Sequence, residues 1–488
     1  LKNTGGVLPL RTEQRIAVLG EFAKKPRYQG AGSSLVNPTR LDTVLAVLDQ
    51  AEVEYQFAPG YSVETDELDE GLLAEACRAA QEADVAVVFA GLTPQYESEG
   101  YDRQHLDLPP NHKALIERVA AVNPNVVVVL SAGAPVTMPW LGQVAAVLHT
   151  YLGGQAGAQA AVDLLFGKVN PCGKLAETYP VRLEDHPVHE FFAYSREQTE
   201  YRESIFVGYR YYDAAGKEVL FPFGYGLSYT QFAYDDLQLS RTRLKDTEEL
   251  VVRCRVKNVG ERSGAEIVQL YVGKPDSPLF RAPQELKGFA KVYLEPGEEK
   301  EVEFTLGFRS FAYYNVEIQD WHVEPGSYAI RIGASSRDIR LTATVDVDST
   351  RPEVAVPDYR RSAPAYYNLQ DPSTRLTKGD FEAVYGRPIP EPAVKARFDE
   401  NSILADLQKT LLGRLVLKFA KQALWKESGA EHQADPTWLM TWAIFLEMPL
   451  RSVAALSGGR IPIHFVRGLI AWANGERGQA LRHWLLRR

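Results

Sequence analysis

The sequence predicts a multidomain protein with an α/β part, a β part and a helical end. Three observations support this. Apolar runs of strand length alternate with helical patterns up to about residue 200, hydrophobicity then alternates with a period of two between about 232 and 350, and helical spacing returns from 401 onward. Strands that alternate with helices are typical of a mainly parallel α/β sandwich, and short strands of period two are typical of an antiparallel β-sandwich. We therefore expect these two domains in that order, followed by a helical C-terminal segment.

The α/β sandwich domain is expected to span residues 1–200. Continuous apolar runs without polar alternation indicate strands that are buried on both faces of a parallel sheet. The predicted strands are 16–20, 54–57, 84–90, 125–130 and 144–149. The predicted helices are 41–51, 68–83, a segment that opens at 108–110, and 155–166.

One loop of this domain gathers acidic side chains directly after a buried strand. Glu97, Glu99 and Asp102 follow the apolar run 84–90, and Gly100 between them allows a tight turn or a close approach to a ligand. Open α/β sheets bind ligands at the carboxyl ends of their strands, so this loop is a candidate site for an acid or base. The residue types alone do not choose among the three carboxylates, and a polar, solvated connection is the plain alternative.

The middle of the chain is expected to hold an aromatic-rich junction at 201–231 and the β-sandwich at 232–350. In the sandwich Val252, Cys254 and Val256 alternate with basic residues, and Pro-Gly pairs at 296–297 and 325–326 mark turns. The aromatic residues of the junction fit a packed contact between domains, and a sugar-stacking face is the alternative. The sandwich is expected to support the site and to take no part in the chemistry.

The end of the chain is expected to form an extended, proline-rich linker at 351–400 and a helical subdomain at 401–488. Two apolar stripes at helical spacing predict its packing; they are Leu404, Leu407, Leu411, Leu415 and Phe419, then Trp438, Trp442 and Phe445. Lys and Arg outnumber Asp and Glu in this segment. We expect it to pack on the rest of the chain or on a second subunit, as in a homodimer, and contact with a membrane surface is the alternative.

Composition excludes several classes of function. The 488 residues carry a net charge of −9, which argues against nucleic acid as a partner because such proteins usually present a basic face. No apolar run approaches the ~20 residues of a membrane span. Cys77, Cys172 and Cys254 are far apart and odd in number, which indicates reduced thiols and a cytoplasmic location. The chain begins at Leu1 without a methionine or a signal-like segment, so a targeting signal could precede it.

No cofactor and no metal ion are expected. Gly30-Ala31-Gly32 follows a strand but lacks the third glycine of a dinucleotide-binding loop. His186, His189 and Glu190 have the spacing of one helix face, but Pro187 interrupts them and no further ligand is near, so a solvated linker is expected there.

Several stretches resemble glycoside hydrolase family 3. Ser98-Glu99-Gly100-Tyr101-Asp102-Arg103 with Leu106-Asp107-Leu108-Pro109 is similar to the family's acid/base loop. Further landmarks follow in the family's order across residues 1–347; they are 1–10, the Gln29–Ser34 loop, the Phe221–Thr230 stretch and Glu285-Leu286-Lys287-Gly288-Phe289. The last of these resembles the family's fibronectin type III-like domain, and the first resembles the entry into its α/β domain.

This resemblance implies a retaining, exo-acting β-glycosidase of the β-glucosidase or β-xylosidase type, which hydrolyses terminal non-reducing β-linked sugars of glucosides or oligosaccharides. It implies Glu99 as the general acid/base, with substrate contacts expected from Tyr96, Glu97, Arg27 and Gln29. The family's nucleophile lies on a (β/α)8 barrel, and nothing barrel-like precedes Leu1. We therefore expect a barrel from the same polypeptide or from a separate chain, and no activity from these residues alone. A non-catalytic module that binds carbohydrate or protein is the alternative.

Overall fold

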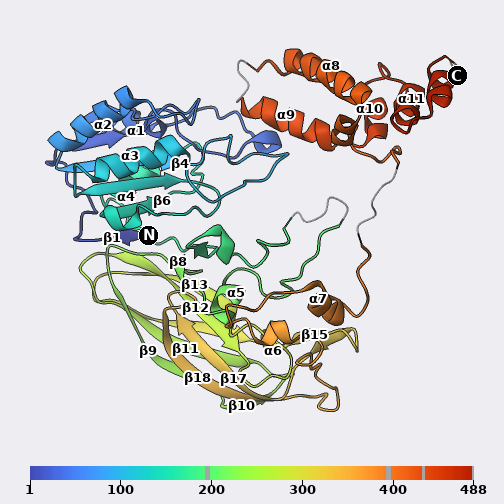
Figure 1. Ribbon diagram of the computed structural model, residues 1–488. Helices are drawn as coiled ribbons and strands as arrows, with labels where there is room; N and C mark the ends of the chain where they lie inside the picture. Colours follow the sequence, from blue (N-terminus) through green and yellow to red (C-terminus); the bar gives the residue numbers. More distant parts are fainter. Residues whose placement is uncertain (193–197, 392–396, 431–434, 486–488) are drawn as a thin grey trace.

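The computed structural model describes residues 1–192, 198–391, 397–430 and 435–485 (Figure 1). The first domain holds a six-stranded sheet with the order β1-β6-β5-β4-β2-β3, in which β1 is antiparallel to β6 and all other pairs are parallel. Its strands are β1 (Lys2–Asn3), β2 (Ile16–Leu19), β3 (Tyr55–Ala58), β4 (Val85–Gly91), β5 (Val126–Ser131) and β6 (Ala146–His149). The mainly parallel α/β fold predicted from the sequence is thus confirmed.

Helices cover both faces of this sheet, which explains the continuous apolar strands. Every residue of β4 is buried, as are the first five of β5. Helix α1 packs beside α4, and α2 packs beside α3. The helices are α1 (Val44–Gln50), α2 (Glu70–Glu82), α3 (Pro110–Ala120) and α4 (Gly157–Leu165), with short 3-10 turns η1 (Glu21–Ala23), η2 (Gly32–Ser34), η3 (Leu141–Gln143) and η4 (Leu183–Asp185). Side chains that cap these helices include Thr43 before α1 and Asp69 before α2.

The strand order reverses between β2 and β4. From β2 the chain passes outward to β3, then crosses over to β4 on the other side of β2 and continues to β5 and β6. The loops after β2 and β4 therefore leave the sheet in opposite directions. Open α/β sheets bind ligands at such a switch point.

The second domain is the predicted antiparallel β-sandwich. A five-stranded sheet of order β10-β18-β17-β12-β13 faces a three-stranded sheet of order β14-β11-β9, and one pair, β10 with β18, is parallel. The strands are β9 (Phe232–Leu239), β10 (Arg243–Lys245), β11 (Leu250–Asn258), β12 (Gly264–Gly273), β13 (Glu285–Leu294), β14 (Glu299–Leu306), β17 (Gly326–Gly333) and β18 (Ile339–Asp348). On β11 the predicted alternation is confirmed, because Val252, Cys254 and Val256 are buried and the basic residues between them are exposed.

Between the domains and along the sandwich the chain forms short elements and an aromatic contact. These elements are β7 (Tyr179–Pro180) paired with β8 (Val219–Phe221), α5 (Tyr209–Ala214), α6 (Phe308–Phe311), β15 (Tyr313–Asn315) paired with β16 (Asp320–His322), η5 (Pro364–Tyr367) and α7 (Lys378–Tyr385). The rings of Tyr209 and Phe223 stack with centroids 4.7 Å apart, and those of Phe221 and Tyr225 with centroids 5.2 Å apart. The aromatic residues of the junction therefore pack on one another.

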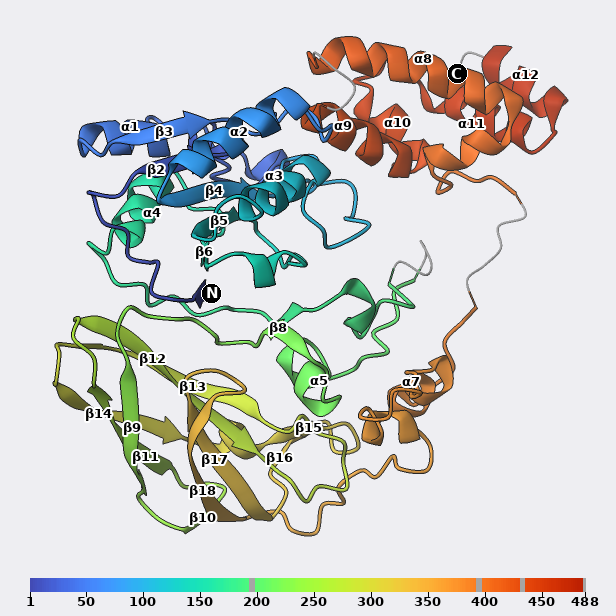
Figure 2. The same ribbon diagram turned by 60° about the vertical axis from the view of Figure 1, so that its left-hand side comes forward.

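The C-terminal segment is a separate group of helices that lies beside the α/β domain (Figure 2). It comprises η6 (Leu404–Lys409), α8 (Leu411–Ser428), α9 (Pro436–Glu447), α10 (Leu450–Leu456), α11 (Ile463–Ala473) and α12 (Arg477–Leu485). The stacked rings of Trp438, Trp442 and Phe445 confirm the second predicted stripe. In the described residues no helix is long and apolar enough to cross a bilayer.

The first predicted stripe of this segment is wrong. Leu404 and Leu407 are buried, but Leu411 is 79% exposed and Phe419 is 62% exposed. The two groups do not share a helix, because Thr410 caps a new helix by accepting a hydrogen bond from the backbone N–H of Gly413. The interruption turns α8 so that Gly413 and Leu417 face the core instead.

Candidate functional site

The loops after β2 and β4 meet at the switch point of the sheet, and Glu99 lies where they touch. Glu99 is exposed on the loop after β4, at the carboxyl edge that the sequence predicts. Its carboxylate accepts two hydrogen bonds from Ser33 on the loop after β2, one from the backbone N–H at 2.9 Å and one from Oγ at 2.6 Å. Both bonds stabilise the charged carboxylate, so they lower the pKa of Glu99 below its ordinary value.

The backbone at Gly32 makes this contact possible. Gly32 has a φ of +80°, and a Cβ built on it would lie only 2.6 Å from Oε2 of Glu99. A side chain at position 32 would therefore displace the carboxylate from Ser33. Gly32 therefore serves the close approach of Glu99.

Glu97, two residues earlier, is in a different environment. Its side chain is 14% exposed and lies with Oε2 3.9 Å from Nη2 of Arg27, whose side chain is 5% exposed. Both carboxylate oxygens also accept the backbone N–H of Gly133, at 2.9 and 3.1 Å, and Arg27 donates to the backbone carbonyl oxygen of Glu97. Glu97 thus ties its own loop to the loop after β5, and burial lowers the pKa of Arg27.

The structure separates the three carboxylates that the residue types left equivalent. Glu97 is a largely buried brace, Glu99 is exposed and accepts hydrogen bonds from the hydroxyl and the backbone N–H of Ser33, and Asp102 is exposed on the outer part of the loop. An exposed carboxylate can exchange a proton with a ligand, whereas the carboxylate of Glu97 is turned inward toward Arg27 and the backbone N–H of Gly133. Glu99 is therefore the group best placed for acid/base chemistry.

The other predicted site residues hold the same loops together. The hydroxyl of Tyr96 donates to Asp66 at 2.8 Å. The amide of Gln29 donates to the carbonyl of Val36 and accepts from the N–H of Val36, which closes the loop that carries Ser33. Contacts of Tyr96, Glu97, Arg27 and Gln29 with a substrate stay predictions.

The sequence did not identify Ser33 as the hydrogen-bond partner of Glu99, or Gly133 as that of Glu97. Ser33 lies in a loop whose glycine-serine pattern was noticed, but nothing in the pattern indicates that its hydroxyl bonds a carboxylate 66 residues later. Gly133 contributes only its backbone N–H, which leaves no trace in residue type.

Several buried polar atoms around Glu97 have no hydrogen-bond partner in the described structure. They include Nε of Arg27, Nε and Nη2 of Arg103 and Oε1 of Gln95. Native proteins leave few such atoms without a partner, and ordered water is the usual partner of buried polar groups of this kind. Burial is the larger effect on Arg103 and lowers the pKa of its guanidinium, and the nearby negative charge of Glu97 opposes that shift.

The same edge of the domain carries exposed apolar side chains. Leu35 is 56% exposed and Val36 is 65% exposed, directly after the turn that carries Ser33. Exposed apolar groups beside polar side chains are typical of a surface that another protein domain covers.

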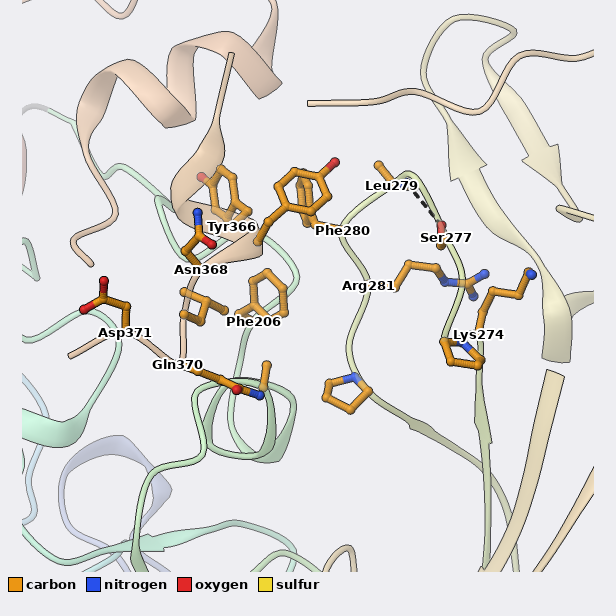
Figure 3. Close-up of a pocket in the computed structure, with 15 residues that line it drawn as sticks. Phe206, Lys274, Ser277, Leu279, Phe280, Arg281, Tyr366, Asn368, Gln370 and Asp371 are labelled. Atoms are coloured by element: carbon orange, nitrogen blue, oxygen red, sulfur yellow. Dashed lines mark hydrogen bonds between the residues drawn. The ribbon is translucent and has the colours of Figure 1, made fainter. Parts of the chain in front are cut away.

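A second candidate, the cavity of about 520 Å³ between the sandwich and the strap at 364–371, is less suited to chemistry (Figure 3). Its aromatic rings stack on one another, with Phe280 and Tyr366 4.6 Å apart, so their faces are not free for a sugar ring. Its acid, Asp371, is exposed and accepts hydrogen bonds from Ser373. Throughout the described residues no three His, Cys, Asp or Glu side chains are close enough to hold a metal ion.

Comparisons with known proteins identify both domains. Residues 1–229 match the family model of the glycosyl hydrolase family 3 C-terminal domain, and residues 266–336 match that of a fibronectin type III-like domain. Thermostable beta-glucosidase B of Acetivibrio thermocellus is 54% identical over 353 residues, which are 72% of this chain and 47% of that protein. An exo-alpha-(1->6)-L-arabinopyranosidase of Bifidobacterium breve is 43% identical over 358 residues, or 71% of this chain and 47% of that protein.

The chain is also similar to solved structures of beta-glucosidases. The crystal structure of a GH3 beta-glucosidase of Bifidobacterium adolescentis superposes with a TM-score of 0.70 at 42% identity, and covers 76% of this chain and 54% of that chain. DesR, a beta-glucosidase of Streptomyces venezuelae in complex with D-glucose, superposes with a TM-score of 0.67 at 29% identity, over 71% of this chain and 58% of that chain. The chain spans about half the length of the curated relatives it matches. It belongs to glycoside hydrolase family 3, of which it carries the C-terminal α/β domain and the fibronectin type III-like domain.

Proposed function

We propose that the chain supplies the general acid/base, Glu99, of a retaining exo-acting β-glycosidase that removes terminal non-reducing β-linked sugars. The observation that carries the proposal is the position of Glu99, an exposed carboxylate at the switch point of the sheet. The names of the relatives support a glycosidase, and they include both glucosidases and an arabinopyranosidase. A β-glucoside is therefore the first substrate to test, with an α-L-arabinopyranoside beside it.

The mechanism needs a second carboxylate. In a retaining glycosidase one carboxylate attacks the anomeric carbon while a second protonates the leaving oxygen, and the two lie about 5 Å apart. We propose that a (β/α)8 barrel domain, in the same polypeptide or in a separate chain, brings the nucleophile to Glu99. The exposed Leu35 and Val36 are groups that such a domain would cover.

Docking would also change the protonation of Glu99. In the present structure Ser33 lowers the pKa of Glu99, which favours the base. Burial by the barrel and the negative charge of the nucleophile both disfavour a second carboxylate, so each raises that pKa. We propose that docking opposes the effect of Ser33 and so provides the proton for the leaving group.

The test replaces Glu99 with Gln in the chain joined to its barrel domain. Protonation of a poor leaving group is lost, so hydrolysis of an alkyl β-glucoside should fall about 10²–10⁴-fold. A dinitrophenyl β-glucoside needs no protonation, so its glycosyl-enzyme should form and accumulate, and azide should restore turnover with formation of a β-glycosyl azide.

Glu97→Gln and Asp102→Asn are the matched controls, because they remove the two other carboxylates of the same loop. Neither should show azide rescue. Rescue of Glu97→Gln in place of Glu99→Gln would assign the acid/base to Glu97, and an unaffected Glu99→Gln would favour a non-catalytic binding module. We expect residues 1–488 alone to hydrolyse aryl β-glucosides at no more than the background rate.

A further inference from the structure

Helix α9 of the C-terminal segment reaches back to the loop that carries Glu99 (Figures 1 and 2). A Cβ built on Gly100 would lie 2.9 Å from Cγ1 of Ile444 and 3.1 Å from the carbonyl oxygen of Met440, so the helix and the loop are in van der Waals contact. Gly100 has a φ of +88° and directly follows Glu99. A segment more than 300 residues away in the sequence therefore lies one residue from the proposed acid/base.

The composition of α9 explains why it needs partners on two sides. Its sequence, Pro436 to Glu447, is apolar almost all the way round, and helices of this kind are normally buried on every face. One side is covered within its own subdomain, where Trp438 is 2% exposed and Trp442 and Phe445 stack. The opposite side carries Met440 and Ile444, and Ile444 remains 44% exposed.

The exposed face of α9 matters because the proposed acid/base, Glu99, acts on the leaving group of the substrate. The acid of a glycosidase donates its proton to the oxygen that joins the sugar to the leaving group. Consecutive Cα atoms are about 3.8 Å apart, so a side chain that touches Gly100 is within a few ångströms of the space beside Glu99. In the proposed arrangement the barrel holds the terminal sugar and Glu99 protonates the oxygen of the leaving group, so the leaving group lies beside Glu99 and its neighbours.

We propose that Met440 and Ile444 of α9 form an apolar wall on the leaving-group side of the site and favour substrates whose leaving group is an alkyl or aryl alcohol. This inference rests on the proposed function of Glu99. It gives the C-terminal subdomain a role in substrate selection. Apolar contact of this kind contributes roughly in proportion to the area buried, and it discriminates between substrates that differ only in chain length.

The test compares methyl and octyl β-glucosides as substrates of the chain joined to its barrel domain. The two leaving groups are both alkoxides of similar basicity, so the ratio of their kcat/KM values reports contact with the alkyl chain and not acid catalysis. For Ile444→Ala this ratio should fall about tenfold. Ile444→Leu keeps the volume and the apolar character and should retain the ratio.

Leu456→Ala is the matched control. Leu456 is 72% exposed on α10 of the same subdomain, so its truncation removes a similar side chain without touching the loop; the ratio should not change. For Leu456→Ala the kcat for a dinitrophenyl glucoside should also equal that of the parent.

Two results would overturn the inference alone, and a third would overturn it together with the proposed function. An unchanged octyl-to-methyl ratio in Ile444→Ala means that the alkyl chain does not meet α9. An equal loss for both substrates means that α9 only supports the loop. A parent enzyme that hydrolyses no glycoside at all refutes the proposed function first, and the inference with it.

Discussion

Replacing Glu97 with Gln should destabilise the α/β domain while leaving the acid/base in place. The substitution keeps one oxygen that can accept from the N–H of Gly133, but it removes the negative charge 3.9 Å from Nη2 of Arg27. The side chain of Arg27 is only 5% exposed, so its charge would remain in the interior without a counter-charge. Breaking one partner of a buried ion pair costs 3–5 kcal/mol, and the long separation together with the retained amide bond favours about 3 kcal/mol here.

The measurement is thermal unfolding of the chain followed by circular dichroism. In a domain of this size 1 kcal/mol shifts Tm by about 2–4 °C, so Glu97→Gln should lower the Tm of the α/β transition by about 6–12 °C. Glu70→Gln is the control, because Glu70 forms an exposed ion pair with Arg118 and surface pairs contribute little. A Tm within about 2 °C of the parent would show that Arg27 does not depend on Glu97, and the view of Glu97 as a structural brace would be wrong.

Two further predictions concern protonation. Burial lowers the pKa of His112 to about 3 and that of His149 to about 4. Histidines of the unfolded chain have pKa values near 6.5, so the unfolded chain takes up protons first as the pH falls, and the free energy of unfolding should drop by about 4 kcal/mol between pH 7.5 and pH 5. Equal urea midpoints at the two pH values would contradict this. Removing the hydroxyl in Ser33→Ala should raise the pKa of Glu99, because the 2.6 Å hydrogen bond from that hydroxyl favours the charged carboxylate. ¹³C NMR titration of the Glu99 carboxyl measures this pKa, and Ser34→Ala is the control. A pKa that stays the same or falls in Ser33→Ala would show that Ser33 does not stabilise the carboxylate.

The strands and the site loop could be predicted because they depend on short-range patterns. The apolar run that became β4 is buried at every position, and the acidic loop after it lies at the carboxyl edge because parallel strands share that edge. The difference between Glu97 and Glu99 could not be predicted. It depends on Arg27, Ser33 and the backbone of Gly133, which come from two other loops.

The C-terminal helical segment shows a second reason why part of the fold could not be predicted from the sequence. Leu404, Leu411 and Phe419 fit one helical period in the sequence, but the period is meaningful only if the helix is continuous. Thr410 starts a new helix inside that pattern, and the residues on its two sides face different environments. The contact of α9 with Gly100 was equally hidden, because no local signal joins positions so distant in the chain.

The close fit between Gly32 and Glu99 links two loops that are otherwise independent in sequence. Any Cβ at position 32 would overlap the carboxyl group of Glu99, so the amino acid allowed at one position is dictated by the side chain at another, 67 residues later. A library that randomises residues 30–36 to change substrate preference should therefore keep Gly32 fixed. Conversely, a variant that shortens residue 99 to Ala opens room for a side chain at 32, and the two positions should be redesigned as a pair.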